Sequence, residues 1–513
     1  MTADFVEELM AAAEHERISR IDTAWLRMDR PGNSMMILSV TITATPVDPG
    51  EFEQRIRQRF LCFPRFRSRP VRDALGASWV EDTDFRLERH VTTVTLDGEA
   101  GKAELEALTA RLAAAPLEAD RPLWQIHLIE DYLGGSAWIT RMHHCYADGV
   151  ALTRVLLAMT EREPGLTEAT EPTGDADEIP EHPGELQHLL DWVGEVTQPA
   201  GDILESLLDE GAKLLEGGIH GVFHPGETVA MAAHASGMAG EFARILALPD
   251  DPDTPLKGQL TGVKRVAWAR PIPLHEVKTI GKATGCTVND VLMSTAAGAI
   301  GGYLREQDVD TAGLEIRASV PVNLRAADEP HTLGNKFGLV FVSLPVGQRN
   351  PLQRLLGMNQ TMDSLKKSLQ PEMTLQVLGL LGLLPATLQT LAVETLSRKS
   401  SVVASNVPGA QAPIYMCGQQ ISEMYFWVPQ SGSIGVGISI LSYAGQVCFG
   451  VISDTGLIAE PHALVDRFEP EFEKLLLGVM MGALATRDEA ARTDPSPTVP
   501  ARKKRARRTK ASK

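Results

Sequence analysis

The chain has 513 residues, which is too long for one ordinary hydrophobic core, so we expect two large lobes. Apolar residues make up 43% of the chain and charged residues 22%, proportions typical of a soluble globular protein. The net charge of −17 disfavours nucleic-acid binding by the folded part. The five cysteines form no CxxC pair, which excludes a disulfide framework and a thiolate zinc site and favours a reducing, cytoplasmic setting.

Two segments bear on membrane attachment. The first 20 residues carry acids and lack both the basic and the apolar region of a secretory signal. The run from Met373 to Val393 is uncharged and approaches bilayer-spanning length, but Gln376, Pro385 and Gln389 interrupt it. We therefore expect a buried or interfacial helix there rather than a membrane span, in a soluble protein that can touch lipid.

The N-terminal part of the chain alternates strand and helix patterns. Residues 36–46 and 136–143 alternate apolar residues with polar or small ones, which is typical of strands. Between them, residues 103–115 have helical periodicity and good helix formers. This alternation predicts an α/β lobe, which we place at residues 1–160.

Residues 161–262 differ in composition from the preceding lobe. The stretch 161–185 is rich in Pro, Gly, Thr and acids, which predicts an exposed, acidic linker. Two apolar stripes at helical spacing follow and predict amphipathic helices: Leu186, Leu189, Leu190 and Val193, then Ile203, Leu204, Leu207, Leu208, Leu214 and Leu215. Such helices either pack across two lobes or form a lid or membrane-facing surface for an apolar substrate.

A second α/β lobe is predicted over residues 263–485. Thr287 can cap a helix that runs to Leu304, and residues 316–322 have the composition of a buried strand. Residues 434–440 alternate strictly and lead through a short turn into a second strand, which predicts a hairpin. Residues 486–513 are predicted to be disordered, and the last 13 of them hold eight Lys or Arg and no acid.

The most informative segment is His143-His144-Cys-Tyr-Ala-Asp148-Gly149, between a predicted strand and a predicted helix. Asp148 is placed to cap that helix, and Gly149 allows a close turn. Adjacent histidines of an extended segment point to opposite faces, so they make a poor metal pair, and we expect no metal site. One imidazole at such a junction suits a general base, but both could equally be hydrogen-bonded core residues.

The spacing HHxxxDG is the signature of the CoA-dependent acyltransferase superfamily, and the chain resembles its bacterial wax ester synthase/diacylglycerol acyltransferase family. No GxSxG elbow, P-loop or intact GxGxxG after a strand competes with it. Ala410 stands where the family often has a second proline, and the basic tail lies outside the family core. Further blocks of the family follow in order between residues 15 and 475: Ser19 to Asp22, Asp120 to Trp124, Thr254 to Leu256, Lys264-Arg265, Asn289-Asp290, Pro321 to Arg325, Gly334-Asn335 and Ser405 to Gly409.

The resemblance implies an acyl-CoA:alcohol O-acyltransferase that makes triacylglycerol, wax ester or both. It implies an α/β fold of two chloramphenicol-acetyltransferase-like lobes joined by a helical linker. A tunnel would run between the lobes, entered by CoA from one side and by the alcohol from the other. No bound cofactor is implied, because acyl-CoA is a co-substrate.

The resemblance also implies roles for individual residues. His144 would be the general base, with His143 in a supporting role and Asp148 orienting the local backbone, for which Arg325 is a candidate partner. Asn289 would stabilise the oxyanion or position the alcohol while Asp290 holds its helix, although both residues could equally be a helix-start device. The candidates for substrate binding, along the tunnel wall or at the turn near CoA, are Gly149, Pro122, Leu123, Trp124, Asp290, Ser405, Asn406 and Gly409.

Two other functions are compatible with the sequence. The acyl donor could be a carrier protein or polyketide, which the acidic body disfavours because carrier proteins are themselves acidic. The chain could instead be a non-catalytic coat protein of lipid inclusions. We expect a cytoplasmic protein that associates peripherally with the inner membrane face or with lipid inclusions, and a basic tail that binds anionic lipid or nucleic acid.

Overall fold

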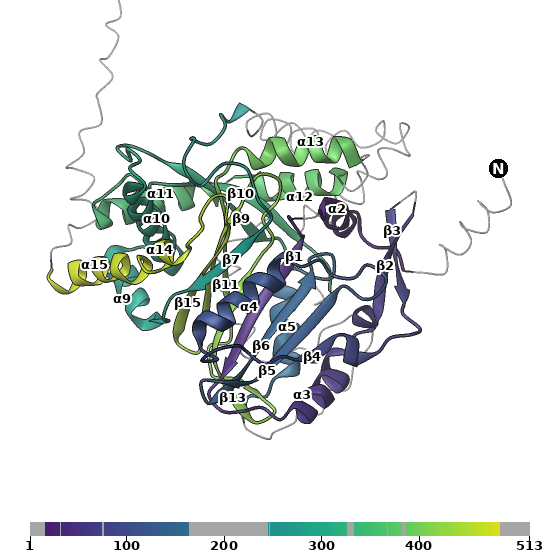
Figure 1. The fold of residues 1–513 in the computed structure, drawn as a ribbon. Coiled ribbons are helices and arrows are strands. Elements are labelled where there is room, and N and C mark those ends of the chain that lie inside the picture. The colour runs from purple at the N-terminus through teal and green to yellow at the C-terminus, as the bar shows by residue number, and fades with distance from the viewer. Residues whose placement is uncertain are drawn as a thin grey trace, which may run out of the picture.

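The computed structural model describes residues 16–30, 32–73, 76–163, 245, 247–325, 333–366, 368–381 and 386–482. Two large mixed sheets form its centre (Figure 1). The first has the order β12-β13-β1-β6-β5-β4, and its strands are β1 (Met36–Thr43), β4 (Val91–Thr93), β5 (Trp124–Tyr132), β6 (Gly135–His143), β12 (Tyr415–Met416) and β13 (Gln419–Trp427).

The second sheet has the order β10-β9-β11-β14-β15-β7, with β8 paired to β15. A separate hairpin joins β2 to β3. The strands of these two sheets are β2 (Ser68–Asp73), β3 (Gly76–Glu81), β7 (Lys264–Trp268), β8 (Ile272–Pro273), β9 (Ile316–Asn323), β10 (Phe337–Leu344), β11 (Val402–Pro408), β14 (Val436–Tyr443) and β15 (Gln446–Asp454).

The helices gather in three places. In Figure 1, α4 crosses the middle of the molecule, α2 lies beside α12 and α13, and α9 to α11 with α14 and α15 cover the second sheet. Their bounds are α2 (Arg20–Met28), α3 (Pro49–Arg55), α4 (Lys102–Ala114), α5 (Gly149–Met159), α9 (Leu274–Thr284), α10 (Val288–Glu306), α11 (Pro351–Leu365), α12 (Gln370–Leu381), α13 (Ala386–Ser397), α14 (His462–Val465) and α15 (Phe468–Met480).

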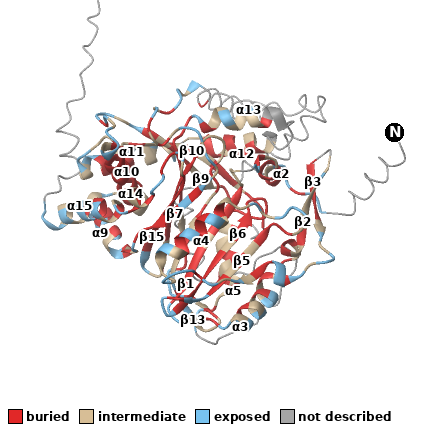
Figure 2. Ribbon diagram, in the orientation of Figure 1, coloured by how far each residue is buried: buried red, intermediate tan, exposed pale blue. Residues whose placement is uncertain are grey.

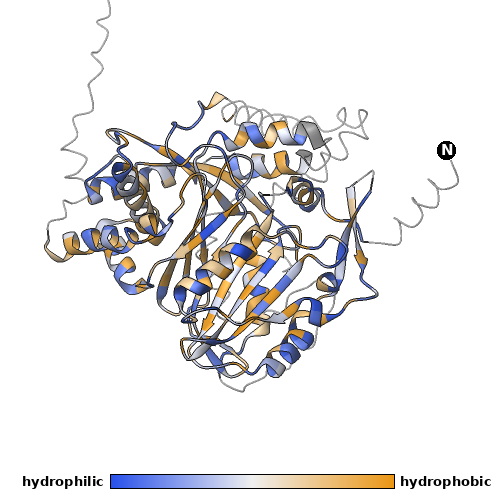
Figure 3. Cartoon of the chain, viewed as in Figure 1, coloured by the Kyte–Doolittle hydropathy of each residue, from blue (hydrophilic) through white to orange (hydrophobic). Residues whose placement is uncertain are grey.

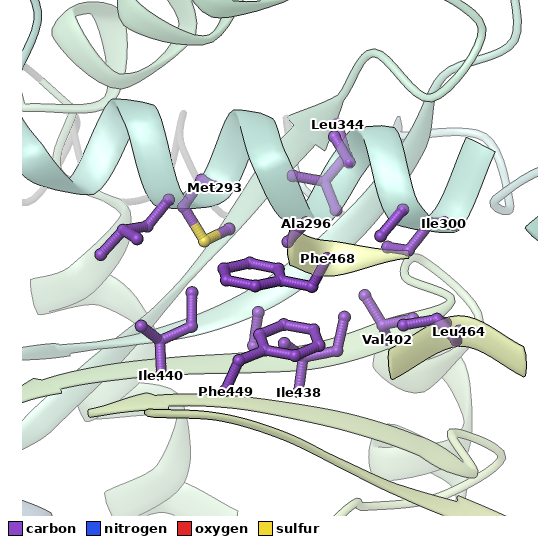
Figure 4. Packing of buried hydrophobic residues seen from close by; sticks show 14 of the residues in the cluster. Met293, Ala296, Ile300, Leu344, Val402, Ile438, Ile440, Phe449, Leu464 and Phe468 are labelled. Atoms are coloured by element: carbon purple, nitrogen blue, oxygen red, sulfur yellow. The ribbon is translucent and has the colours of Figure 1, made fainter. Parts of the chain in front are cut away.

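The core of the second lobe lies between its sheet and α10. Figure 4 shows side chains of α10, such as Met293 and Ile300, facing the strand residues Ile438 and Ile440. Phe449 of β15 stacks on Phe468 of α15 with ring centroids 3.9 Å apart. The strands of both sheets are largely buried (Figure 2), and hydrophilic residues gather on outer helices such as α3 (Figure 3). The strand at 316–322, predicted to be buried, is β9, which is buried at Ile316, Ala318 and Ser319 and half-buried elsewhere.

A separate apolar cluster joins the two sheets. It combines Val40 of β1 and Leu105 of α4 with Trp268 of β7 and Trp427 of β13. The indole of Trp268 lies over Tyr425 at 5.1 Å between ring centroids. Because residues of both sheets and of α4 share this cluster, burial of apolar surface stabilises one sheet against the other.

Two strands from the C-terminal half of the chain join the first sheet, although the predicted division at residue 263 assigned them to the second lobe. β13 pairs antiparallel with β1, with Leu38 opposite Trp427 and Ile42 opposite Glu423, so it belongs to the first sheet. β12 extends this sheet and is bridged to Glu161. β13 covers the edge of β1 that β6 leaves unpaired. No local sequence pattern encodes a pairing between segments so far apart.

Other sequence predictions have mixed outcomes. The strands near 36–46, 136–143 and 316–322, the helices near 103–115 and 289–304, and the hairpin of β14 and β15 are all present within a few residues. The uncharged run lies in α12 and α13, and none of the described helices is long and apolar enough to cross a membrane. The predicted amphipathic helices of the linker and the basic tail lie outside the described residues.

Candidate active site

The histidine pair lies where β6 ends and α5 has not yet begun. The backbone N–H of His143 donates to the carbonyl of Leu123 at 2.9 Å, and that of His144 donates to the carbonyl of Met35 at 2.8 Å. Asp148 then caps α5, its carboxylate accepting from the N–H of Ala151 at 3.0 Å. The turn is thus held by backbone hydrogen bonds at the histidines and by the Asp148 side chain at the start of α5.

His143 has the contacts of a structural residue. Its imidazole is buried, and Nδ1 accepts a hydrogen bond from the backbone N–H of Cys145 at 3.1 Å. Nδ1 therefore carries the lone pair, and the proton of the neutral ring lies on Nε2. Burial lowers the pKa of His143 to about 3, so the ring is neutral near pH 7.

His144 is buried among aromatic rings. Its imidazole stacks on the indole of Trp25, with ring centroids 4.4 Å apart and an interplanar angle of 17°, and lies 5.5 Å from the ring of Phe337. Burial lowers the pKa of His144 to about 4. At neutral pH this imidazole is uncharged and carries a lone pair, which is the state a general base requires.

The depressed pKa of His144 has a consequence for acid stability. The unfolded chain takes up the proton near pH 6.5 whereas the folded chain resists it down to about pH 4, so stability is lost as the pH falls through this window. At pH 5 the loss from this one residue is about 2 kcal/mol. Asp22 acts in the opposite direction, because burial raises its pKa to about 6 and its cost is relieved below that pH.

Comparing wild type with His144→Ala isolates this one contribution. Urea denaturation at pH 7.5 and at pH 5 should show that wild type loses about 2 kcal/mol more on acidification than the variant. All other titrating groups are common to both proteins, so their contributions cancel. Equal losses in the two proteins would mean that the folded state does not hold His144 neutral.

Asp148 lies in a buried ion pair with Arg325, the partner considered from the sequence. Its carboxylate also accepts from the N–H of Ala151 and, at 3.1 Å, from the N–H of Lys336. Although burial raises the pKa of Asp148, the Arg325 guanidinium and these two N–H groups together hold it below its usual value. These contacts tie the start of α5 to the second lobe, and the orienting role of Asp148 stays a prediction.

The second lobe reaches the motif through Gly334 and Asn335. The carbonyl of Gly334 accepts from the Asp148 N–H and from Arg325 Nη2, and its own N–H donates to the Tyr146 carbonyl at 3.1 Å. Asn335 Nδ2 donates to the carbonyl of His144 at 2.6 Å. The Gly334-Asn335 block had no role in the sequence analysis; the structure places it directly against the histidine turn.

The Pro122-Leu123-Trp124 block supports the same turn. The Leu123 N–H donates to the Tyr146 hydroxyl at 3.0 Å, and its carbonyl accepts from His143. Trp124 is fully buried, and its Nε1–H donates to the carbonyl of Phe66 at 2.8 Å. These contacts are structural, and a position on the tunnel wall stays a prediction for all three residues.

Asn289 and Asp290 lie at the start of α10 and have different partners. Asp290 forms a capping box with Thr287: the Thr287 N–H donates to Asp290 Oδ2 at 2.8 Å, and the Asp290 N–H donates to the Thr287 hydroxyl at 3.2 Å. This matches the helix-start alternative for Asp290. Asn289 Oδ1 instead accepts from Asn406 Nδ2 at 2.8 Å, which joins α10 to β11.

The substrate-binding candidates in and after β11 differ in their distance from the histidine turn. A Cβ on Gly149 would lie 3.7 Å from Val407 Cγ2, so the start of α5 approaches the end of β11. Ser405 is buried in the strand. Gly409 donates its N–H to the Ser442 carbonyl at 2.7 Å, and a Cβ there would lie 2.8 Å from the same oxygen. Contact of this segment with CoA stays a prediction.

An apolar cavity begins at Trp25, the residue that stacks on His144. It is lined mainly by aliphatic, thioether and aromatic side chains of α2, β10, α12 and α13, including Leu339, Phe341 and Met373. A larger cavity of about 660 Å³ adjoins it and shares Met28 and Val393 in its lining. His144 does not line either cavity; its link to the apolar cavity is the indole of Trp25, which lines the cavity and stacks on the imidazole.

Comparison with known families decides the classification. Residues 18–292 match the family model of the wax ester synthase/diacylglycerol acyltransferase catalytic domain, and residues 333–476 match that of the WS/DGAT C-terminal domain. The chain belongs to the wax ester synthase/diacylglycerol acyltransferase family. The two matches include the HHxxxDG turn and the Gly334-Asn335 block, as the resemblance predicted.

Relatives agree with membership of this family, and solved structures share the fold. A probable diacylglycerol O-acyltransferase of Mycobacterium tuberculosis is 27% identical over 438 residues, covering 82% of this chain and 86% of the relative. The wax ester synthase/diacylglycerol acyltransferase of Marinobacter aquaeolei VT8 has a TM-score of 0.63 at 21% identity, covering 91% of this chain and 100% of that chain. A starter condensation domain of rhizomide synthetase has a TM-score of 0.56 at 15% identity, covering 94% and 96%. At these identities the two structures establish the shared α/β fold.

Proposed function

We propose that this acyltransferase moves a long-chain fatty acyl group from acyl-CoA to the hydroxyl of diacylglycerol, of a long-chain alcohol, or of both. The products are triacylglycerol and wax ester, with free CoA released. The observation that carries the proposal is the position of His144: a buried, neutral imidazole stacked on Trp25, which itself lines an apolar cavity. Family membership supports the same reaction.

The proposed reaction is a direct transfer. His144 takes the proton of the acceptor hydroxyl as that oxygen attacks the thioester carbonyl, and a tetrahedral oxyanion forms. When this intermediate collapses, the carbon–sulfur bond breaks and the imidazolium returns its proton to the CoA sulfur. Asn289 Oδ1 accepts a hydrogen bond from Asn406 Nδ2. In the proposed reaction the Nδ2 hydrogens of Asn289 stabilise the oxyanion or position the alcohol.

The apolar cavity has a volume of only about 60 Å³, so its lining supports contact with part of the hydrocarbon portion of an acyl chain or an acceptor. Burial of methylene groups against side chains such as Leu339 and Met373 is favourable by about 0.8 kcal/mol per CH₂. Fatty alcohol and diacylglycerol both have hydrocarbon chains that could pack against this lining. The choice between them is therefore part of the experiment.

Purified protein incubated with palmitoyl-CoA and either hexadecanol or dipalmitoylglycerol tests the proposal. Free CoA is measured with a thiol reagent, and the lipid products are separated and identified. We expect ester formation that depends on the acceptor and is lost in His144→Ala. Release of CoA without ester would indicate a thioesterase, and ester formed only from an acyl carrier protein would indicate the carrier-dependent alternative.

We also propose that the protein associates peripherally with the inner membrane face or with lipid inclusions. The end of α15 exposes three large apolar side chains, Leu477, Met480 and Met481, of which Met480 and Met481 are 74% and 77% exposed. The chain then continues into the segment that holds eight Lys or Arg among its last 13 residues. An apolar patch followed in the sequence by a basic segment matches an anionic lipid surface, which attracts each nearby basic residue by about 1 kcal/mol.

Deletion of the residues after Pro500 should weaken binding to liposomes that contain anionic lipid at low salt. The difference should fade as salt rises, because exposed charges are screened within about 8–10 Å at physiological ionic strength. Co-sedimentation measures the binding, and turnover of a dispersed substrate should not change. A full-length control with the eight basic residues replaced by Gln should behave like the deletion. Undiminished liposome binding by both variants, or retention on nucleic acid alone, would refute the role of the tail.

A further inference from the structure

A buried asparagine connects His144 to a second acid. Asn335 Nδ2 donates one hydrogen to the carbonyl of His144 and the other to Asp22 Oδ1, both at 2.6 Å. Both partners are acceptors, so the orientation of the amide is fixed by its chemistry. With the two Nδ2 hydrogens used, Asn335 Oδ1 is left buried and without a hydrogen-bond partner among the described residues.

The imidazole of His144 offers the matching donor. Its Nδ1 is likewise buried and has no hydrogen-bond partner in the described part of the chain. Burial lowers the pKa of His144, and the Asp148 charge, the carbonyl of His144 itself and the Asn335 side chain raise it by less; the last two groups adjoin the ring. The free atom of Asn335 and this carbonyl are both oxygen acceptors. A proton on Nδ1 of His144 can be donated to these oxygens, and the lone pair of the neutral ring then lies on Nε2.

We propose that Asp22 and Asn335 form a positioning pair that fixes the orientation and the tautomer of His144. In the reactive complex Asn335 Oδ1 accepts a hydrogen bond from the Nδ1–H of His144, and Asp22 holds the Asn335 amide in the orientation that allows it. Catalytic hydrogen bonds are often loose without substrate and tighten when it binds. The inference rests on the proposed function, because it assigns the supports of the general base.

The local fold holds Asp22 in place for this role. The other carboxylate oxygen, Oδ2, accepts from the Ser19 hydroxyl at 2.8 Å, and Ser19 is the N-cap of α2. Trp25 extends from the same helix and stacks on His144. Helix α2 therefore supports the His144 imidazole in two ways: Trp25 packs on the face of the ring, and Asp22 holds Asn335 at the edge of the ring.

Gly334 fits this arrangement. Its φ of +111° favours glycine, and a Cβ there would lie 3.4 Å from Asp22 Oδ2. The glycine thus lets the backbone before Asn335 pass close to the carboxylate. In this way the Ser19 to Asp22 and Gly334-Asn335 blocks, far apart in sequence, meet at one histidine.

The kinetic test compares variants of both residues. We expect Asp22→Ala and Asn335→Ala to lower kcat about 10–100-fold, by analogy with the loss when the hydrogen-bond partner of a metal-ligating histidine is removed. The KM for palmitoyl-CoA should change by less than about twofold, since neither residue binds substrate in the proposal. Asp22→Asn keeps an oxygen that can accept from Asn335, so it should restore most of the turnover.

Glu471→Ala is the matched control. Glu471 is also a buried carboxylate, paired with Arg354 at 2.7 Å, but it lies on α15 against α11 in the second lobe. This variant should lose at least as much stability as Asp22→Ala, because it leaves the buried Arg354 guanidinium without its charge partner, and it should keep its kcat per folded molecule. If Glu471→Ala lowers kcat as much as Asp22→Ala does, the effect of Asp22 is general destabilisation and the proposal fails.

The tautomer is measured by ¹⁵N NMR of histidine-labelled protein, with the His144 signals identified by their loss in His144→Ala. We expect protonated Nδ1 in wild type and a mixture of the two neutral tautomers in Asn335→Ala. Protonated Nε2 in wild type, or an unchanged tautomer in the variant, would overturn the proposal. This readout needs no turnover, so a wild type without acyltransferase activity would refute the proposed function alone.

Discussion

Replacement of His144 by alanine is expected to lower kcat by about 10²–10⁴-fold while the protein remains folded. No other imidazole in the described residues stacks on the aromatic ring that lines the apolar cavity, and His144 is neutral at the pH of the assay. Turnover is measured with palmitoyl-CoA and the preferred acceptor, and near-ultraviolet circular dichroism reports the fold. The KM for acyl-CoA should change little, because the proton transfer occurs only in the chemical step.

His143→Ala is the natural comparison. That change removes the acceptor of the Cys145 N–H and leaves a buried donor without a partner, which costs about 1–3 kcal/mol. The main loss should therefore be in stability, with a smaller loss of kcat per folded molecule. Large and equal losses of kcat in two well-folded variants would show that both imidazoles take part in the chemistry.

Asp148→Ala is expected to destabilise the protein by about 3–5 kcal/mol, because it leaves the buried Arg325 guanidinium without its charge partner. The loss exceeds the value for a helix cap alone, which is about 0.5–2 kcal/mol. Turnover should fall together with stability. Urea denaturation followed by circular dichroism measures the free energy of unfolding.

Thr287→Ala separates the two contributions of Asp148. Thr287 caps α10 in a comparable way and belongs to no buried ion pair among the described contacts, so its loss should cost only the cap. A difference of about 2 kcal/mol or more between the two variants is the expected contribution of the unpaired arginine. An Asp148→Ala protein with wild-type stability and no turnover would instead assign Asp148 a direct part in the reaction.

Local features of the fold could be predicted because they depend on neighbouring residues. The cap of α5 by Asp148 and the cap of α10 by Thr287 follow from residue types that satisfy free N–H groups at helix starts. The turn between β14 and β15 follows from Ala444 and Gly445, both of which have positive φ. The histidine turn between strand and helix was also predicted, since its two flanking patterns have different periods.

The supports of His144 could not be predicted from local pattern. Asp22, Trp25 and Asn335 come from α2 and from the approach to β10, and nothing in their neighbourhoods indicates a contact with an imidazole. The only available signal was their presence in the family blocks or beside them. The place of β13 was missed for the same reason: its residues have a strand pattern, but the pattern does not say which edge they will join.

The pairing of β13 with β1 constrains how the chain folds during synthesis and where it can be cut into fragments. β1 is complete once its own residues leave the ribosome, but its partner β13 is about 380 residues further on, roughly 20–80 s later at usual rates of synthesis. During that interval one side of β1 is an unpaired, apolar edge of the kind that attracts other chains. A fragment that ends within the linker lacks β13 and keeps this edge unpaired. We therefore expect the two halves of the enzyme to become soluble only when they are produced together, so that the C-terminal half can donate β13 to the first sheet.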